Sequence, residues 1–575
     1  MKTFQEIKKN CRLDSTGLPQ VKAALLGNCA TQHLAMALRG YAYECGLGLQ
    51  VYDADYNQIA AQTMDPDSEL YQFGPQYVVL QMCSEKLWEE FCALPVNARS
   101  SWADATMEQI AHTWRLIERN CGARILQYDF VELDENVFGS FGSKVSVSFQ
   151  YQMRKLNMLL MDQAAQNKNV FLLNLSGLQN RMGRGVSFDA KFYYSAKLPL
   201  SFAALPEAAK LAVDMIQALR GRIKKCVVLD LDNTLWGGVI GDDGMAGIQI
   251  GELGKGHAFS NLQLWLRELK NRGVILAVCS KNNEDTAKEP FLHHPEMVLR
   301  LEDISMFVAN WDDKASNIRY IQQTLNLGMD SFVFIDDNPF ERNMVHSLIP
   351  EITVPELPED PALYLDYIQS LNLFETASYS EEDGNRTRQY QEEVGRATLQ
   401  KQFESVDDYL ISLEMKAEVK PFDEFHYPRI AQLTQRSNQF NLRTVRYTEE
   451  DVRRIAHDDR YIPLYFTLRD KFGDHGLISV VILEKQQDAL FVDTWLMSCR
   501  VLKRGMEEFI VNEIIASAKA AGYKKVIGEY LKTPKNAMVA DIYQKLGFQR
   551  ISDTRFEADT DTFEQNASHI MKEEK

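Results

Sequence analysis

Apolar runs of strand length alternate with stretches of helical character over much of the chain. In the N-terminal third, such runs lie at 21–26, 49–52, 77–80 and 170–173, and a helical stretch at 32–43 follows the first of them. In the middle third, further runs lie at 226–229, 274–278 and 331–335. Strands that alternate with helices predict doubly wound parallel sheets with their sites at the carboxyl ends of the strands.

The length of 575 residues is sufficient for three or four domains. We expect a first α/β domain over 1–220 and a second over 221–375. A polar, helix-prone stretch over 376–410 reads as a connecting helix; the alternative, a binding arm, has no specific support. The last domain, over 411–575, contains a strand-like run at 491–497 and a helix at about 506–521.

Two carboxylates follow the apolar run 226–229, at Asp230 and Asp232. One carboxylate can attack phosphorus while the other moves the proton of the leaving group. The intervening Leu231 points the opposite way, because side chains alternate along extended backbone. Alone, this pair is weak evidence, since a solvated turn or a structural calcium loop can look similar.

Two later segments supply groups that bind phosphate. Ser280 follows the run 274–278 by two residues. There, its hydroxyl and the N–H groups of a following helix can hold phosphate oxygens. Lys314 is a compact, mobile cation that can balance the charge of a nucleophile and a phosphoryl group.

A second acidic pair, Asp336 and Asp337, follows the run 331–335. Mg²⁺ prefers a few carboxylates together with water and substrate phosphate. We therefore expect Mg²⁺ as cofactor, with Asp230, Asp336 and a backbone carbonyl near Asp232 as a sensible shell. Between the two acidic residues of the second pair, Asp336 is the first choice.

This order of segments resembles the haloacid dehalogenase (HAD) phosphatase superfamily, and residues 229–244 look like its FkbH branch. The resemblance implies that Asp230 is the nucleophile and Asp232 the general acid/base. It further implies that Ser280 and Lys314 bind the phosphoryl group, and that the metal site draws on Asp230, Asp232, Asp336 and Asp337.

The short spacing from Asp232 to Ser280, and from Ser280 to Lys314, leaves little room for an inserted cap domain. Four glycines between 237 and 244 suit a tight hairpin flap, since glycine tolerates positive φ. A capless site is open, which suggests a macromolecular substrate or a lid from a neighbouring domain.

The N-terminal domain resembles a degenerate SGNH (GDSL-like) hydrolase, with Asn28 and Cys29 where that family has Asp and Ser. Cys29 at a helix N-terminus could be a thiolate nucleophile. It would need a histidine as base, but the expected Asp-x-x-His is missing and His33 suits surface or packing. A docking or recognition role is the preferred alternative.

The last domain resembles a GNAT acyltransferase. Arg500 and Gly505 match the loop that binds the pyrophosphate or phosphopantetheine arm and are candidate substrate-binding residues, whereas Lys503 replaces a glycine. If that position needs positive φ, lysine costs about 1 kcal/mol. Tyr543 is a candidate proton donor or a packed residue, and His475, near a hairpin turn, is a candidate base.

Cys499 has two interpretations. Most free cysteines are small buried hydrophobes. Arg500 and the positive end of the following helix would instead favour the thiolate, so Cys499 could hold an acyl group as a thioester and count as a catalytic residue.

Composition narrows the class of protein. The formal charge of −17 argues against a nucleic-acid binder, which normally shows a basic face. No stretch approaches the roughly 18 apolar residues of a membrane span, so no membrane partner is expected. Nine cysteines without paired spacing favour reduced thiols and a cytoplasmic location.

The expected fold is thus a multidomain α/β protein, with a capless HAD Rossmann-like sheet flanked by an SGNH-like α/β domain and a GNAT-like α+β domain. FkbH-like enzymes are associated with taking a phosphoglyceryl group from 1,3-bisphosphoglycerate, dephosphorylating it and loading glycerate onto an acyl carrier protein. The resemblance implies these partners: a phosphorylated small-molecule acyl donor and the phosphopantetheine thiol of a carrier. The candidate docking residues for the carrier are Arg181, Arg184, Arg500, Lys503 and Arg504.

Three rivals remain open. A plain Mg²⁺ phosphohydrolase of a small phosphate ester would need no acyl transfer and no Cys499. A scaffold protein would be indifferent to Asp230→Asn. Amine acetylation from acetyl-CoA is disfavoured by Lys503 and by the attached phosphatase.

Overall fold

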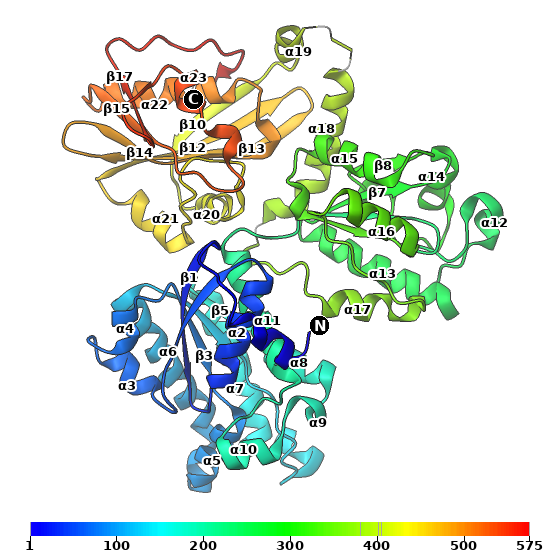
Figure 1. Cartoon of the computed structure of the whole chain (residues 1–575), viewed down its shortest axis with the longest axis vertical. Coiled ribbons are helices and arrows are strands. Elements are labelled where there is room, and N and C mark those ends of the chain that lie inside the picture. The colour runs from blue at the N-terminus through cyan, green and yellow to red at the C-terminus, as the bar shows by residue number, and fades with distance from the viewer. Residues whose placement is uncertain (1, 380, 401, 404, 574–575) are drawn as a thin grey trace. The chain divides into compact units, whose positions relative to one another are not determined.

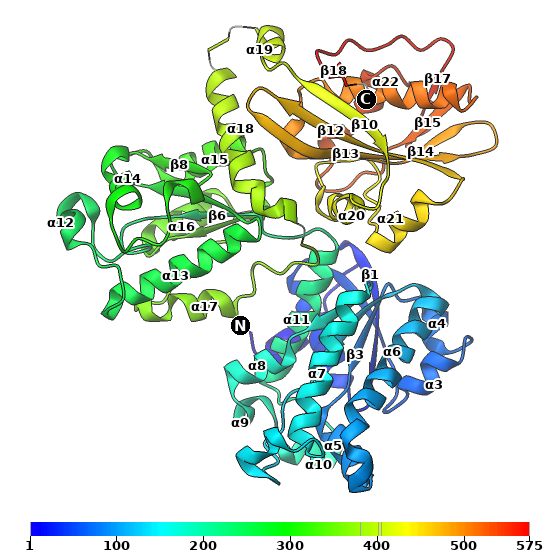
Figure 2. The same cartoon turned by 180° about the vertical axis from the view of Figure 1, so that it is seen from behind.

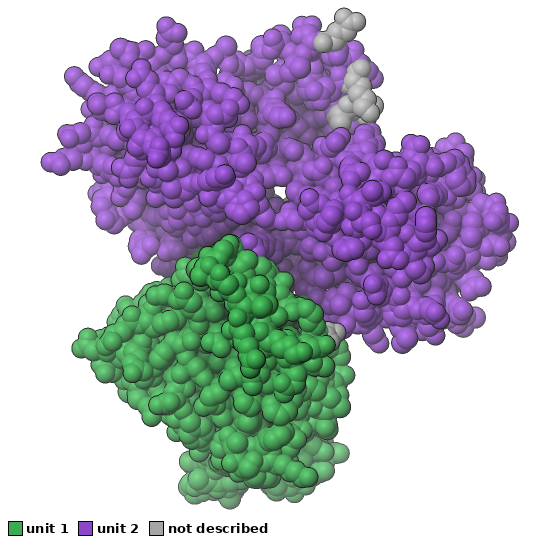
Figure 3. Space-filling view, viewed as in Figure 1, with its two compact units in different colours: residues 1–218 green, residues 219–575 purple. Residues whose placement is uncertain are grey.

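A computed structural model describes residues 2–379, 381–400, 402–403 and 405–573 of the chain. The chain divides into two compact units, Met1–Ala218 and Leu219–Lys575 (Figure 3). Among the described residues, no helix combines the length and the apolar character that crossing a bilayer requires.

The first unit is built on a parallel five-stranded sheet in the order β2-β1-β3-β4-β5. Its strands are β1 (Gln20–Gly27), β2 (Gly48–Asp53), β3 (Tyr77–Gln81), β4 (Arg124–Tyr128) and β5 (Val170–Leu173). Its helices are α1 (Phe4–Asn10), α2 (Gln32–Glu44), α3 (Ile59–Met64), α4 (Glu69–Phe73), α5 (Ser84–Ala93), α6 (Trp102–Cys121), α7 (Phe149–Gln166), α8 (Leu175–Met182), α9 (Arg184–Ser187), α10 (Ala190–Ala196) and α11 (Ala204–Leu219).

Helices cover both faces of this sheet. Helix α2 lies in front of the sheet in Figure 1, and α7 lies in front of it in the opposite view of Figure 2. Alternate strand residues supply each face, as period-two side chains require. Ala24, Leu26, Val78 and Leu80 pack in one cluster with residues of α6 and α7 such as Trp114.

The second unit begins with a parallel four-stranded sheet in the order β8-β7-β6-β9. Its strands are β6 (Cys226–Leu229), β7 (Ile275–Ser280), β8 (Met306–Ala309) and β9 (Phe332–Ile335). The helices around it are α12 (Ile240–Gly247), α13 (Gly254–Asn271), α14 (Glu284–His293), α15 (Lys314–Leu325), α16 (Pro339–Leu348) and α17 (Tyr364–Ser370).

Strand β6 is buried on both faces. Val227 and Leu229 pack in the cluster that holds α13 and α17, whereas Cys226 and Val228 pack in the cluster that holds α15 and α16. A strand covered on both sides reads as a continuous apolar run, which is why its predicted bounds are confirmed.

The last part of the chain forms a nine-stranded, mostly antiparallel sheet in the order β16-β17-β15-β14-β13-β12-β10-β18, with β11 paired to β14. Its strands are β10 (Lys416–Pro421), β11 (Phe440–Asn441), β12 (Tyr461–Asp470), β13 (Gly473–Lys485), β14 (Leu490–Met497), β15 (Lys525–Glu529), β16 (Gln549–Arg550), β17 (Arg555–Asp559) and β18 (Met571–Lys572). Its helices are α20 (Tyr427–Arg436), α21 (Glu449–Ala456), α22 (Met506–Ala520) and α23 (Ile542–Lys545). Helix α22 packs on one face, and α20 and α21 pack on the other.

Helix α18 (Arg386–Gln400) joins the two sheets of the second unit, and α19 (Val406–Ser412) follows it. Tyr390 packs in the core beside α15 and α16. Arg396, 1% exposed, forms a bidentate pair with Asp470 at 2.7 Å and contacts Glu393 at 2.9 Å. The helical connection expected at 376–410 therefore also carries a buried ion-pair contact to the hairpin β12–β13.

The fold confirms a mixed α/β class with two parallel sheets. One expectation is wrong: the glycine-rich segment after Asp232 contains helix α12 rather than a hairpin flap. Of the four glycines, Gly237 forms a β-bridge, with Gln249, at the base of this segment. Glycine at 244, with φ +65°, ends the regular part of the helix, so the glycines mark a kink and not a strand turn.

Candidate functional site

Asp230 directly follows β6, the strand that lies between β7 and β9. Its carboxylate is buried and lies 3.0 Å from the Nζ of Lys314. Lys314 is the first residue of α15, and its Nζ also lies 2.5 Å from Asp336. One buried cation thus joins the carboxyl ends of β6 and β9.

Asp232 lies in the turn after β6 and has a different environment. Its Oδ1 accepts hydrogen bonds from the indole Nε1 of Trp236 and from the backbone N–H of Ile240, both at 2.9 Å. Its Oδ2 accepts from Asn282 Nδ2 at 2.8 Å. Three donors thus fix the orientation of this carboxylate.

Ser280 ends β7 and is buried. Its Oγ accepts a hydrogen bond from Asn282 Nδ2 at 3.2 Å, so Asn282 bridges Ser280 and Asp232. The predicted nucleophile, acid/base and phosphate-binding hydroxyl therefore gather at one edge of the sheet.

Asp336 and Asp337 follow β9. The backbone N–H of Asn338 donates to Asp336 Oδ1 at 2.8 Å, and Thr234 donates its Oγ1 proton to Asp337 Oδ1 at 3.4 Å. One ligand oxygen each from Asp230, Asp336 and Asp337 can lie within 4.8 Å of the others. This oxygen-only donor set fits Mg²⁺, which favours a few carboxylates and leaves positions for substrate.

Burial raises the pKa of Asp230 to about 6, although Lys314 acts against the shift. Burial likewise raises the pKa of Asp336 and of Asp337. For Lys314, burial is outweighed by Asp230 and Asp336, and its pKa rises. Three carboxylates with one lysine leave an excess of negative charge, which favours a divalent cation.

Two exposed aromatic side chains follow strands of this sheet in the sequence. Trp311, after β8, is 76% exposed, and Phe340, at the start of α16, is 69% exposed.

The predicted substrate-binding loop of the last domain follows β14. Arg500 is buried and donates to Gln389 of α18, to Ser498 Oγ and to the carbonyl of His475. Gly505 caps α22 with φ +79°. Lys503 has φ +60°, so the position does require the left-handed region, and its substitution for glycine is strained.

His475 and Tyr543 are both buried, at 1% exposure each. The Nε2 of His475 contacts Asp470 at 3.2 Å, and burial lowers the pKa of His475. The ring of Tyr543 packs against Trp495 and Phe556. Both side chains are held within the domain core, and their proposed catalytic roles stay predictions.

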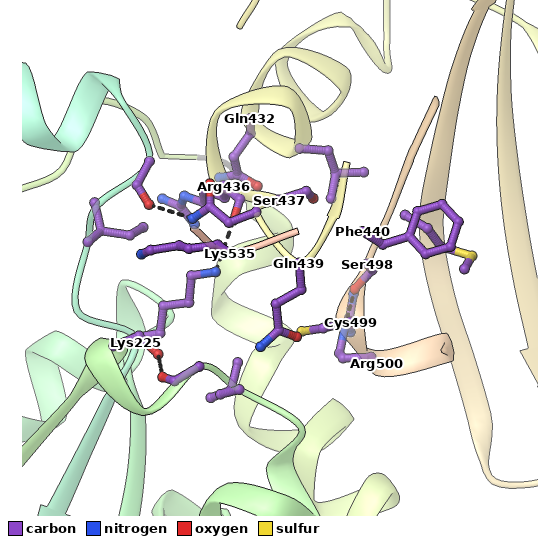
Figure 4. A pocket seen from close by; sticks show the side chains of 18 of the residues that line it. Lys225, Gln432, Arg436, Ser437, Gln439, Phe440, Ser498, Cys499, Arg500 and Lys535 are labelled. Atoms are coloured by element: carbon purple, nitrogen blue, oxygen red, sulfur yellow. Dashed lines mark hydrogen bonds between the residues drawn. The ribbon is translucent and has the colours of Figure 1, made fainter. Parts of the chain in front are cut away.

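Cys499 lies in a short 3₁₀ turn (Cys499–Val501) after β14. It is partly buried and packs against the cores of both sheets of the second unit. With Lys225, Arg436 and Arg500 it lines a cavity of about 240 Å³ (Figure 4).

The cavity lies at the amino ends of the strands in the first sheet of this unit, and the acidic cluster lies at their carboxyl ends. Lys225 precedes β6 and Ser331 precedes the parallel β9, whereas Asp230 and Asp336 follow these strands. Five residues of extended chain from Lys225 to Asp230 span roughly 16 Å, at about 3.3 Å per residue. Cys499 and Asp230 therefore serve separate sites.

In the first unit, Cys29 follows β1 and is buried beside Cys83 and Tyr193. The neighbouring Cys83 and burial raise the pKa of Cys29 well above its usual value. His33 stacks on Phe202 and lies tilted against Phe4, as expected for a packing residue. These contacts support the non-catalytic alternative for Cys29.

Sequence reasoning missed Asn282, Trp236 and Lys225. Asn282 stands two residues after Ser280, a spacing that returns its amide to the same strand end. Trp236 bonds to Asp232, only four residues earlier, but this bond needs a turn that was not predicted from the sequence. The partner of Lys225 is Arg436, far away in sequence, so Lys225 carries no local signal.

Comparison with known proteins gives the following matches. The model of the FkbH N-terminal domain matches residues 22–217. The N-terminal part of the protein BF1531 from Bacteroides fragilis, which contains a phosphatase domain complexed with Mg, is 47% identical. The match covers 66% of this chain and 100% of that one, with a TM-score of 0.64.

Matches to acetyltransferases are much weaker. The ribosomal-protein-S18-alanine N-acetyltransferase from Escherichia coli is 14% identical over 24% of this chain and 90% of that one, with a TM-score of 0.20. The GNAT domain of S. lividans PAT is 20% identical over 24% and 89%, also with a TM-score of 0.20. Such scores carry no argument, so the GNAT and SGNH assignments stay predictions. No curated protein matches the chain.

The order of the segments, the acidic cluster after β6 and β9, and the match to the whole solved N-terminal part of BF1531 agree with one another. The chain belongs to the FkbH family and contains a phosphatase domain of that type.

Proposed function

We propose that the chain is a Mg²⁺-dependent phosphatase and acyltransferase that dephosphorylates a phosphoglyceryl-type acyl unit and loads it onto an acyl carrier protein. The observation that carries the phosphatase half is the cluster of Asp230, Asp336 and Asp337, with the Nζ of Lys314 between Asp230 and Asp336. Bound Mg²⁺ would neutralise developing charge on phosphoryl oxygens, and these three carboxylates would hold it.

The residues then have defined roles in phosphoryl transfer. Asp230 forms a bond to phosphorus, while the bond between phosphorus and the ester oxygen breaks and Asp232 gives that oxygen a proton. A water molecule next attacks the aspartyl-phosphate and releases inorganic phosphate, while Asp232 takes the proton of the water. Ser280 and Lys314 bind the phosphoryl oxygens throughout.

Acyl transfer would use Cys499. Its sulfur forms a bond to the acyl carbon of an acyl phosphate, the bond from that carbon to the phosphate oxygen breaks, and phosphate leaves with the thiol proton. The carrier thiol then attacks the thioester and regenerates Cys499. A thioester passes to another thiol with little change in free energy, so no further energy source is needed.

Intact-protein mass spectrometry tests both halves. The chain is incubated with Mg²⁺ and 1,3-bisphosphoglycerate, with and without a phosphopantetheinylated carrier. We expect a phosphorylated acyl adduct on the chain that is lost in Cys499→Ala and that passes to the carrier. On the carrier it should lose its phosphate in the wild type and keep it in Asp230→Asn.

Two outcomes would change the proposal. Phosphate release from a small ester, with no acyl adduct and an unmodified carrier, would favour a plain Mg²⁺ phosphohydrolase. Unchanged phosphate release in Asp230→Asn would contradict the assigned nucleophile.

A further inference from the structure

The cavity beside Cys499 is assembled from six separate stretches of the second unit, four of which supply the residues that follow. Lys225 comes from the amino end of β6, Arg386 from α18, Arg436 from α20, and Cys499 from the turn after β14. Its volume of about 240 Å³ is below the roughly 300–1,000 Å³ of sites for drug-sized ligands, so its occupant is small.

Positive charge dominates the lining. Among the described residues that line the cavity, six are cationic and Asp330 is the one carboxylate. The six are Lys225, Arg386, Arg429, Arg436, Arg500 and Lys535. This excess is unusual in a chain whose formal charge is −17, and it is local to the cavity.

Two described carboxylates form ion pairs with three of these cations. Asp383 contacts Arg386 at 2.6 Å and Arg436 at 2.8 Å, and Asp330 pairs with Lys535. Within the described part of the chain, no carboxylate forms an ion pair with Lys225 or Arg500. Lys225 donates instead to the carbonyl of Arg436 at 2.9 Å.

The pKa values of two lining groups also indicate an excess of positive charge in the cavity. Burial, with smaller contributions from Arg386, Lys535 and Arg436, lowers the pKa of Lys225 to about 8. Burial and the charge of Arg386 lower the pKa of Arg436 to about 9. An anion in the cavity would relieve both effects, because it would attract the cations at short range in a partly dry site.

We propose that this cavity is a binding site for a small molecule that carries a phosphate group, with Lys225, Arg436 and Arg500 facing the phosphate and the thiol of Cys499 beside it. Phosphate is the chemistry that clustered arginines and lysines recognise best. If the proposed function holds, two molecules would bring that group: an acyl phosphate donor and the phosphopantetheine arm of the carrier.

The test measures protection of Cys499 from alkylation in the full chain. Iodoacetamide labelling is followed by peptide mass spectrometry, with EDTA present so that the acidic cluster holds no metal. The probes are inorganic phosphate, 3-phosphoglycerate and pantetheine 4′-phosphate, and glycerol is the neutral control. Cys92, which is exposed, reports non-specific effects.

We expect a phosphorylated probe at saturation to slow labelling of Cys499 at least tenfold and to leave Cys92 unchanged. Comparing the probes identifies the source of the phosphate group. Lys225→Met should raise the half-protecting concentration at least tenfold. Lys535→Met, which removes a partly exposed lining cation, should also raise the half-protecting concentration. This second variant keeps the test valid if Lys225→Met fails to fold.

Lys224→Met is the matched control. Lys224 is adjacent in sequence, its pKa is also lowered by burial to about 8, and it donates to the carbonyl of Asp330 at 2.7 Å, but it does not line the cavity. It should leave the half-protecting concentration unchanged. Absence of protection by every phosphorylated probe, or equal protection in the three lysine variants and the wild type, would overturn the proposal.

This experiment is independent of the proposed function. It needs neither Mg²⁺ nor turnover, so a chain that binds phosphate here but transfers no acyl group would retain the anion site and lose the acyltransferase. Conversely, turnover without protection of Cys499 would keep the function and remove this site.

Discussion

Lys314→Met should destabilise the phosphatase domain strongly, because it removes a cation from between two buried carboxylates. The Nζ lies 3.0 Å from Asp230 and 2.5 Å from Asp336. At an effective dielectric constant of about 20, each contact contributes about 5–7 kcal/mol of attraction. Part of it offsets the desolvation of the three groups, and removing one partner of such a buried set costs about 3–5 kcal/mol.

Hydrogen exchange of the amides of β6 and β9 measures this loss locally, which suits a chain with several domains. A loss of 3–5 kcal/mol corresponds to exchange faster by about 100- to 4,000-fold. Mg²⁺ should slow exchange more in Lys314→Met than in the wild type, because the carboxylates have lost their counter-charge.

Two controls separate charge from packing. Lys288→Met removes a lysine that lies 2.5 Å from Glu284 on the surface of α14, and it should cost about 0.5 kcal/mol or less. The double variant Lys314→Met with Asp230→Asn should recover part of the loss. Equal exchange rates in the single and double variants, with no response to Mg²⁺, would refute the charge-based reasoning.

Three other variants or treatments give separate tests. Lys503→Gly should raise the free energy of unfolding by up to about 1 kcal/mol, since φ is +60° there, and a lower thermal midpoint would contradict the assigned strain. Tyr543→Phe should leave acyl transfer unchanged, because the ring is packed among Trp495 and Phe556; a hundredfold loss would restore it as a proton donor. Cys29 should resist iodoacetamide from pH 7 to 9 while Cys92 reacts, because a raised pKa keeps the buried thiol protonated below that pKa, and rapid labelling of Cys29 would contradict its burial.

Seven of the nine parallel strands were predicted, because strands covered on both faces read as apolar runs. Strands β4 and β8 were missed. The runs at 170–173 and 226–229 match β5 and β6 residue for residue. The strand expected at 274–278 is shifted by one or two residues, to Ile275–Ser280, because Cys279 and Ser280 are buried as fully as the apolar part. Burial sets such a boundary, and local composition does not report it.

The acidic cluster was predictable as well, since carboxyl ends of adjacent parallel strands must meet. The orientation of Asp232 was not, because it depends on an indole and an amide that fold back from Trp236 and Asn282. The cavity beside Cys499 was even harder to predict from the sequence. Its cations lie at positions 225, 386, 436 and 500, and no local pattern connects residues so far apart in sequence.

Strand β6 has a kinetic consequence. With the thiol at one end of a rigid strand and the phosphatase carboxylates at the other, an acyl group attached to Cys499 stays out of reach of Asp230 for as long as it stays attached. If the proposed acyl transfer takes place, the intermediate must travel between the two ends, and the molecule that carries it decides whether it is retained or lost to solvent. A carrier with a flexible arm would make passage between the two ends efficient, whereas free diffusion would let phosphorylated intermediate accumulate in the medium. Leakage of that intermediate as carrier concentration falls would thus report directly on the separation that β6 imposes.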